Sequence, residues 1–103
     1  MDIQHNHIPQ DGEIIDLLFA RSEQGLGEIQ SKYGNALMYM ARTIVKNEQD
    51  AEECVNDTLI RIWDSIPPNR PGSLYAYAMK IVRNLSLNRL QALQAQKRNG
   101  AHA

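Results

Sequence analysis

The stretch from Asn47 to Ile66 has the hydrophobic pattern of a helix with two different faces. Apolar residues recur every three or four positions, which is typical of a helix packed against a core. The apolar stripe contains Ala51, Cys54, Val55, Thr58, Leu59, Ile62, Trp63 and Ile66. The opposite face contains Glu52, Glu53, Asn56, Asp57, Ile60, Arg61 and Asp64. The pattern alone leaves two interpretations of this second face: a solvated surface with ion pairs between residues four apart, or a surface for a partner.

Two helices are predicted before this stretch. Asp11 is a suitable N-cap for a short helix over residues 13–21, most of whose surface is apolar and has to be buried. Ser22 is the next candidate cap, for a helix that runs to about Val45 with apolar residues in steps of three and four. Each glycine inside a helix costs about 1 kcal/mol relative to alanine, so burial of this stripe has to hold the helix together. Three glycines lie within it: Gly25, Gly27 and Gly34.

A proline-rich loop and one more helix are predicted after it. Pro67, Pro68, Pro71 and Gly72 end the preceding helix and make a short, stiff loop, and Ser73 caps the last helix. Its inward positions are predicted to be Leu74, Tyr77, Ala78, Ile81, Leu85 and Asn88. Its outward positions are predicted to be Tyr75, Lys80, Arg83 and Leu87.

The elements together predict an all-α fold, a compact helical bundle of about four helices over residues 11–95. Residues 1–10 show no periodicity and are expected to form a flexible tail, and residues 96–103 are expected to fray. A chain of 103 residues is long enough for one small helical core but too short for two.

The charge distribution changes this picture more than the net charge of −1 does. Residues 1–64 contain all twelve acids and five of the eleven Lys and Arg residues, whereas residues 65–103 contain the other six cations and no acid. Fields between exposed charges fade over about 8 Å at physiological salt, so a basic segment can meet phosphate groups in a protein that is nearly neutral. A basic end that merely complements a helix dipole would explain Lys97 and Arg98, but not Lys80 and Arg83 in the middle of a helix.

Several classes of protein are disfavoured by what the sequence lacks. One cysteine cannot form an internal disulfide, and the sequence has neither an apolar run long enough to span a membrane nor a signal peptide, so we expect a cytoplasmic protein. No paired carboxylates, activated nucleophile or phosphate-binding glycine loop stands out, so we expect neither an enzyme nor a cofactor. His5, His7 and His102 do not match a metal-ligand spacing with one another or with Cys54.

The central and C-terminal segments resemble the second conserved region of sigma-70 family transcription factors, in the small extracytoplasmic-function group. The similarity rests on several motifs in the family's order and covers roughly residues 13–95. These motifs are Tyr33-Gly34, the Asp-Ala-Glu-Glu run at 50–53, Asn56-Asp57, Trp63 and Ile81-Val82-Arg83-Asn84. Any one of them alone would be a weak signal.

The resemblance implies a role in transcription initiation with two binding surfaces. The family's region binds the clamp helices of the RNA polymerase β′ subunit and opens the promoter −10 element, holding its non-template single strand. The implied polymerase-binding residues are Glu52, Glu53, Asn56, Asp57 and Ile60. The implied DNA-binding residues are Asn69, Arg70, Ser73, Tyr75, Tyr77, Lys80, Arg83 and Asn84.

Two departures from the family pattern qualify this implication. Leu74 and Tyr77 stand where many relatives have Phe and Trp, which leaves fewer surfaces for stacking bases, and Tyr77 faces either the DNA or the core. A complete factor of this group carries another domain, a helix-turn-helix that reads the −35 element, and we do not expect the residues after 95 to encode it. We therefore expect either a fragment of a two-domain factor or a stand-alone domain.

Two other functions fit parts of the sequence. A helical protein-interaction module could bind an anti-sigma factor or a second copy of itself through the acidic face, but it would not require the acid-free C-terminal segment. A small helix-turn-helix repressor is disfavoured because the loop from Pro67 to Gly72 is longer and stiffer than the usual turn of that motif.

Overall fold

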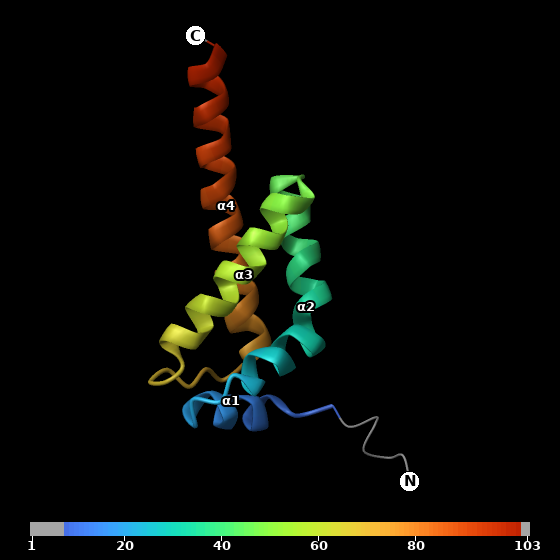
Figure 1. Ribbon diagram of the computed structural model, residues 1–103, viewed down its shortest axis with the longest axis vertical. Coiled ribbons are helices and arrows are strands. Elements are labelled where there is room, and N and C mark those ends of the chain that lie inside the picture. Colours follow the sequence, from blue (N-terminus) through green and yellow to red (C-terminus); the bar gives the residue numbers. More distant parts are fainter. Residues whose placement is uncertain (1–7, 102–103) are drawn as a thin grey trace.

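The computed structural model describes residues 8–101, with the side chains described as far as Arg98. It confirms the all-α bundle, because these residues form helices and no strand. The helices are α1 (Asp11–Phe19), α2 (Gln24–Val45), α3 (Glu48–Ser65) and α4 (Leu74–Ala101). Helix α1 packs on α2, while α2, α3 and α4 pack on one another (Figure 1). The described helices include none that is long and apolar enough to cross a membrane.

The helix ends follow local sequence signals in most places. The Ser73 hydroxyl accepts a hydrogen bond from the Ala76 N–H at 3.1 Å, so it caps α4 as predicted. The Asn47 side chain accepts one from the Asp50 N–H at 2.9 Å and caps α3. At α1 the predicted cap was wrong. The N-cap of α1 is Gln10, whose N–H donates to the Glu13 carboxylate, and Asp11 is already the first helical residue.

The second helix starts slightly later than its predicted cap implies. Its N-cap residue is Glu23, although the Ser22 hydroxyl accepts a hydrogen bond from the Gln24 N–H at 3.3 Å. The helix ends at Val45 as predicted, with Lys46 in the left-handed conformation at a φ of 57°.

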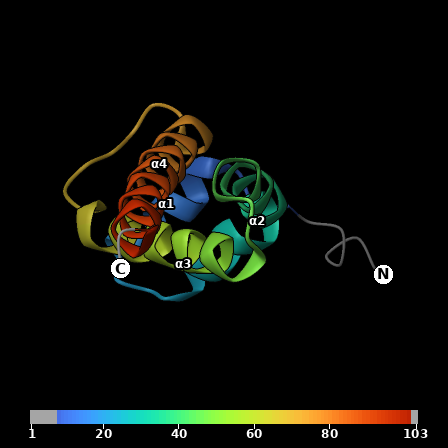
Figure 2. The ribbon, with the colours of Figure 1, turned by 90° about the horizontal axis from the view of Figure 1, so that it is seen from above.

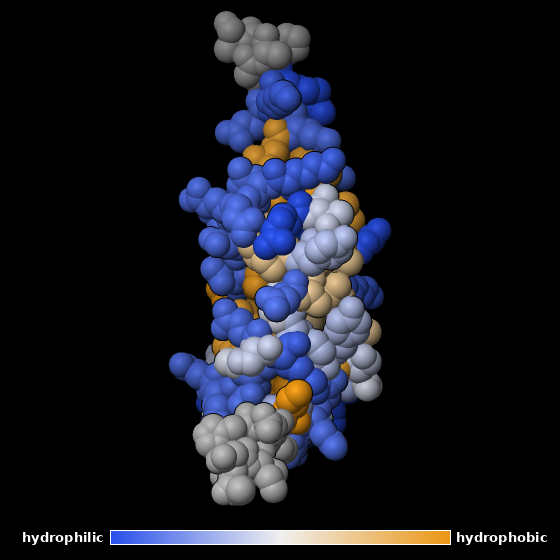
Figure 3. All heavy atoms as spheres, turned by 90° about the vertical axis from the view of Figure 1, so that its right-hand side faces the viewer, coloured by the Kyte–Doolittle hydropathy of each residue, from blue (hydrophilic) through white to orange (hydrophobic). Residues whose placement is uncertain are grey.

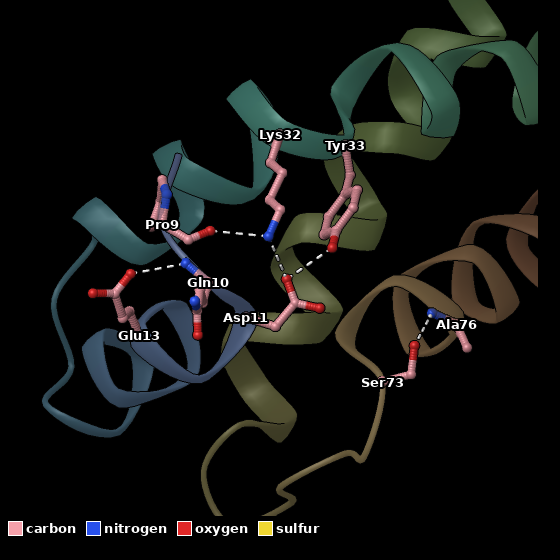
Figure 4. Close-up of polar contacts among 8 residues, drawn as sticks. All are labelled: Pro9, Gln10, Asp11, Glu13, Lys32, Tyr33, Ser73 and Ala76. Carbon is pink, nitrogen blue, oxygen red and sulfur yellow. Dashed lines mark hydrogen bonds and ion pairs between the residues drawn. The ribbon is translucent and has the colours of Figure 1, made fainter. Parts of the chain in front are cut away.

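Asp11 does not cap α1 but links α1 to α2 (Figure 4). Its carboxylate accepts hydrogen bonds from the Lys32 ammonium at 2.9 Å and the Tyr33 hydroxyl at 2.7 Å. The Lys32 ammonium also donates to the Pro9 carbonyl. Burial opposes the charge on Asp11, but these hydrogen bonds outweigh it and hold the pKa of Asp11 below its ordinary value.

The apolar stripe of α3 faces the core as predicted. Seven of its eight residues are buried and the eighth, Trp63, is half-buried at the edge of the core. The hydroxyl of Thr58 is satisfied inside the core by donating to the Cys54 carbonyl at 2.7 Å. Close packing between α1 and α2 depends on Gly25, because a Cβ there would lie 2.9 Å from Cδ2 of Leu18.

The inward face of α4 agrees with the prediction in its first turns and departs from it further along. Leu74 and Ala78 are buried as predicted, but Val82 and Ser86 continue the buried stripe, whereas Asn88, expected to face inward, is exposed. Leu87, expected on the outside, is half-buried. Residues spaced by four advance about 40° around a helix at each step, so this stripe crosses α4 diagonally. A diagonal stripe is what a helix needs when it packs on two neighbours, here α2 and α3.

The C-terminal end of α4 also differs from expectation. We expected the chain to fray beyond Ala95, whereas α4 continues to Ala101 and its last turns extend past the ends of α2 and α3 (Figure 1). Viewed from above, α4 and α2 lie on opposite sides of the bundle, and α3 runs along its lower edge from beneath α4 to α2 (Figure 2). The predicted N-terminal tail lies largely outside the described residues, and so do His5, His7 and His102.

Candidate functional site

The outer face of α3 is exposed along its whole length. Glu52, Glu53, Asn56, Asp57 and Ile60 all lie at the surface, and 57% of the Ile60 surface is accessible. A single exposed apolar side chain is common on protein surfaces, so the exposure of Ile60 makes it available to a partner but does not by itself indicate one. Asp57 and Arg61 are not within ion-pair distance in the described part of the chain, so the pairing expected from their spacing is absent there.

A groove between α2 and α3 adjoins this face. It has a volume of about 400 Å³, and Val55 and Met38 supply its apolar lining. The remaining lining residues are Gln30, Gly34, Asn35, Glu52 and Asn56. Sequence reasoning identified the α3 wall but missed the α2 wall, although Gly34 was part of a family motif. Figure 3, which turns α2 towards the viewer, shows a mainly hydrophilic surface with small separated apolar areas.

Glu53 is already engaged within the molecule. Arg89 of α4 donates hydrogen bonds to Asp50 at 3.1 Å and to Glu53 at 2.5 Å, which joins the first half of α3 to α4. The hydrogen bond that Arg89 donates to the Glu53 carboxylate raises the pKa of Arg89 above its ordinary value. Arg89 therefore partly neutralises the carboxylate of Glu53, whereas the carboxylates of Glu52 and Asp57 remain more available to a partner.

The loop between α3 and α4 is anchored to α1. The Arg70 guanidinium lies 3.2 Å from the Asp16 carboxylate and 4.5 Å from the centre of the Phe19 ring. The peptide bonds preceding Pro67 and Pro68 are cis. The loop and α1 share the lower end of the molecule in Figure 1.

A second arginine holds the end of α3. Nη1 of Arg21 donates to the carbonyls of Trp63 at 3.0 Å and Ile66 at 3.1 Å, and its guanidinium lies 3.7 Å from the centre of the Trp63 ring. These carbonyls belong to the last turn of the helix and the residue after it, which lack partners within the helix. Arg21 therefore caps α3 from a position 42 residues earlier in the chain.

Both aromatic side chains of α4 make contacts within the molecule. Tyr77 is half-buried, and its hydroxyl lies 2.7 Å from the Ser65 hydroxyl and 3.1 Å from the Asn69 amide nitrogen. Tyr75 is 45% exposed and packs on Tyr33, with ring centres 5.3 Å apart. Ser73 uses its hydroxyl as the α4 cap.

Some cations of the acid-free segment form ion pairs within the molecule, so fewer of them are available to a partner than the sequence implies. Arg70 and Arg89 are paired with acids of α1 and α3. Among the described residues, Lys80 and Arg83 have no ion pair, and they lie on the exposed side of α4 together with Asn84. Lys80, Asn84 and Tyr77 also line a pocket of about 340 Å³ against the end of α3.

Comparison with known protein families identifies the family of this chain. The family described as sigma-70 region 2 matches residues 29–96, which is more than half of the chain and includes α3, the loop and most of α4. Helix α1 lies outside the matched range. Neither the curated proteins nor the solved structures contain a significant match. The chain belongs to the sigma-70 region 2 family.

Proposed function

We propose that this domain acts in transcription initiation as the region 2 of an extracytoplasmic-function sigma factor. In this proposal α3 binds the β′ clamp helices of core RNA polymerase, and the loop and α4 recognise and open the promoter −10 element. The observation that carries the proposal is the separation of two exposed surfaces, one rich in acids on α3 and one with the unpaired cations Lys80 and Arg83 on α4.

The polymerase surface is supported by exposure and by shape. Ile60 supplies an apolar contact, while Glu52 and Asp57 supply charge that would favour a basic partner and discriminate against an acidic one. The groove beside this face adds polar side chains of α2, notably Gln30 and Asn35, as contacts that would set the register of a bound helix.

The DNA surface is supported by free cations beside an anchored loop. A loop held by Arg70 and Asn69 loses little freedom when it grips a strand, which lowers the entropic penalty of binding. Stacking on aromatic rings contributes about 1–3 kcal/mol per base in other single-strand binders. Because Tyr75 packs on Tyr33 and the Tyr77 hydroxyl is engaged, we expect this domain to depend more on cations than on stacking.

Two charge reversals test whether the surfaces are separate. Asp57→Lys should weaken binding to core RNA polymerase and leave DNA binding intact, because a like charge then faces the basic partner. Arg83→Glu should weaken binding to a single-stranded −10-like oligonucleotide and reduce its salt dependence, whose slope is about −0.7 per phosphate contact. Fluorescence anisotropy with the oligonucleotide and pull-down of the polymerase measure the two interactions.

Matched controls separate local effects from a change in net charge. Glu23→Lys and Lys46→Glu change the charge by the same amounts at exposed sites on or next to α2, and neither residue has an ion pair in the described structure. Both controls should leave the two interactions unchanged. Equal damage to both interactions by either test variant, with the protein still folded by circular dichroism, would contradict the proposal. Polymerase binding without salt-dependent DNA binding would instead favour the protein-interaction module.

A further inference from the structure

A pocket lies where the end of α3 meets the first half of α4. Its volume is about 340 Å³, and Arg61 and Ser65 of α3 form one wall. The facing wall consists of Tyr77, Lys80, Ile81 and Asn84 of α4. The pocket therefore combines two cations, one amide and an apolar base made by the Tyr77 ring and Ile81.

A chain of hydrogen bonds fixes the shape of this pocket. The Asn69 amide donates to the Tyr77 hydroxyl at 3.1 Å, and the Tyr77 hydroxyl donates to the Ser65 hydroxyl at 2.7 Å. The Ser65 hydroxyl in turn donates to the Arg61 carbonyl at 2.8 Å. Every hydroxyl in this chain accepts one hydrogen bond and donates one, so the loop, α4 and α3 are joined in a single arrangement. The walls are thus positioned before any ligand arrives.

The charges at the pocket are of one sign. Arg61 and Lys80 are exposed, no carboxylate lines the pocket, and neither cation forms an ion pair in the described part of the chain. Arg61 belongs by sequence to the acidic face of α3, yet the structure places it beside the cations of α4. A guanidinium and an ammonium that line one pocket suit a phosphate group, which the guanidinium can bind through two parallel hydrogen bonds.

We propose that this pocket holds a phosphodiester group of the single-stranded DNA, with Arg61 as a phosphate-binding residue opposite Lys80. The adjoining sugar would lie on the Tyr77 ring and Ile81. This inference rests on the proposed function and adds to it that one residue of α3 serves DNA binding and not polymerase binding. The hydrogen-bonded chain from Asn69 to Arg61 would hold both sides of the phosphate site in place.

Salt titration of oligonucleotide binding tests the inference. Arg61→Gln and Lys80→Gln should each reduce the magnitude of the salt slope for a short single-stranded oligonucleotide by about 0.7, and the double variant by about 1.4. For one lost contact, the fall in affinity between about 50 mM and about 200 mM salt becomes about 2.6-fold smaller. Lys46→Gln removes the same charge from an exposed site next to α2 and should leave the slope unchanged. Arg61→Gln should also leave polymerase binding unchanged.

The outcomes distinguish this inference from the function on which it rests. A normal slope for Arg61→Gln, together with a reduced slope for Arg83→Glu, overturns the phosphate site and leaves the proposed function standing. A loss of polymerase binding by folded Arg61→Gln likewise assigns Arg61 to the other surface. Absence of salt-dependent binding by the unaltered protein overturns both. Circular dichroism melting of each variant shows whether it is folded, and Arg61→Lys, which keeps the charge, should restore most of the slope.

Discussion

Replacing Arg21 by alanine tests the cap that this residue places on the end of α3. The substitution removes the hydrogen bonds to the carbonyls of Trp63 and Ile66 and the contact with the Trp63 ring. Both Arg21 and alanine have a Cβ, so the strain of the left-handed backbone at a φ of 56° is nearly the same in both proteins. The change in stability therefore reports the lost interactions.

The magnitude follows from the exposure of these contacts. Hydrogen bonds from a charged group contribute about 1.5–3 kcal/mol when protected, but Arg21 is exposed, so about 1 kcal/mol for the two carbonyl contacts together is realistic. The guanidinium over the ring adds about 0.5–1 kcal/mol, and a positive charge at a helix C-terminus adds about 0.3–1 kcal/mol. The total is about 2–3 kcal/mol, which for a domain of this size lowers the melting temperature by about 8–24 °C.

Thermal and urea denaturation followed by circular dichroism measure this loss. A double-mutant cycle with Trp63→Leu should give a coupling of about 0.5–1 kcal/mol between Arg21 and Trp63. Arg21→Gly provides a control, because it loses the same contacts but relieves the backbone strain and should be more stable than Arg21→Ala by about 1 kcal/mol. A melting temperature of Arg21→Ala within about 2 °C of the unaltered protein would refute the cap. Additive effects of the two substitutions would refute the contact between the guanidinium and the Trp63 ring.

Three further predictions concern the packing and pH dependence of the fold. Ser86→Ala should leave stability unchanged or raise it by up to about 1 kcal/mol in urea denaturation, because the buried Ser86 hydroxyl has no hydrogen-bond partner among the described residues. Gly25→Ala should destabilise the protein by about 1–2 kcal/mol, because the added Cβ would overlap Leu18. Gly27→Ala should stabilise it by up to about 1 kcal/mol, because the space around its Cβ is open. The opposite order of the two melting temperatures would contradict this packing. The pKa of Asp11 is lower in the folded than in the unfolded protein, so the ionised Asp11 stabilises the fold fully above a pH of about 4, and this stabilisation is lost as the pH falls through the folded pKa. Asp11→Asn should remove this part of the dependence of stability on acid pH. If stability falls with acid pH in the same way in Asp11→Asn, this contribution of Asp11 is excluded.

The orientation of α3 could be predicted because its pattern is local and strong. An apolar residue every three or four positions specifies the buried side of a helix without reference to any neighbour, and Asn47 supplies its own cap. The exposure of the residues proposed for polymerase binding follows from the same period, whereas their role is implied by the family resemblance. The proline-rich loop and the Ser73 cap were also predictable, because proline and serine act on the backbone within a few residues.

The face of α4 could not be predicted in the same way. Its sequence offers apolar residues at several angles, such as Leu85 and Leu87, so more than one stripe fits the period. Only the simultaneous packing on α2 and α3 selects the diagonal stripe that includes Val82 and Ser86. Tyr77 illustrates the consequence, because it is half-buried and its hydroxyl serves a network that no period in the sequence encodes.

The charge of the candidate site was determined by tertiary structure. The sequence shows six cations in an acid-free segment, but it does not show that Arg70 reaches Asp16 across 54 positions or that Arg89 reaches Glu53 across 36. Long flexible side chains form ion pairs with groups that are close in space, and residues so far apart in the chain come close only when the helices pack. The division between the free cations of α4 and the paired ones, and the placement of Arg61 beside Lys80, therefore arise from the fold and not from the local pattern.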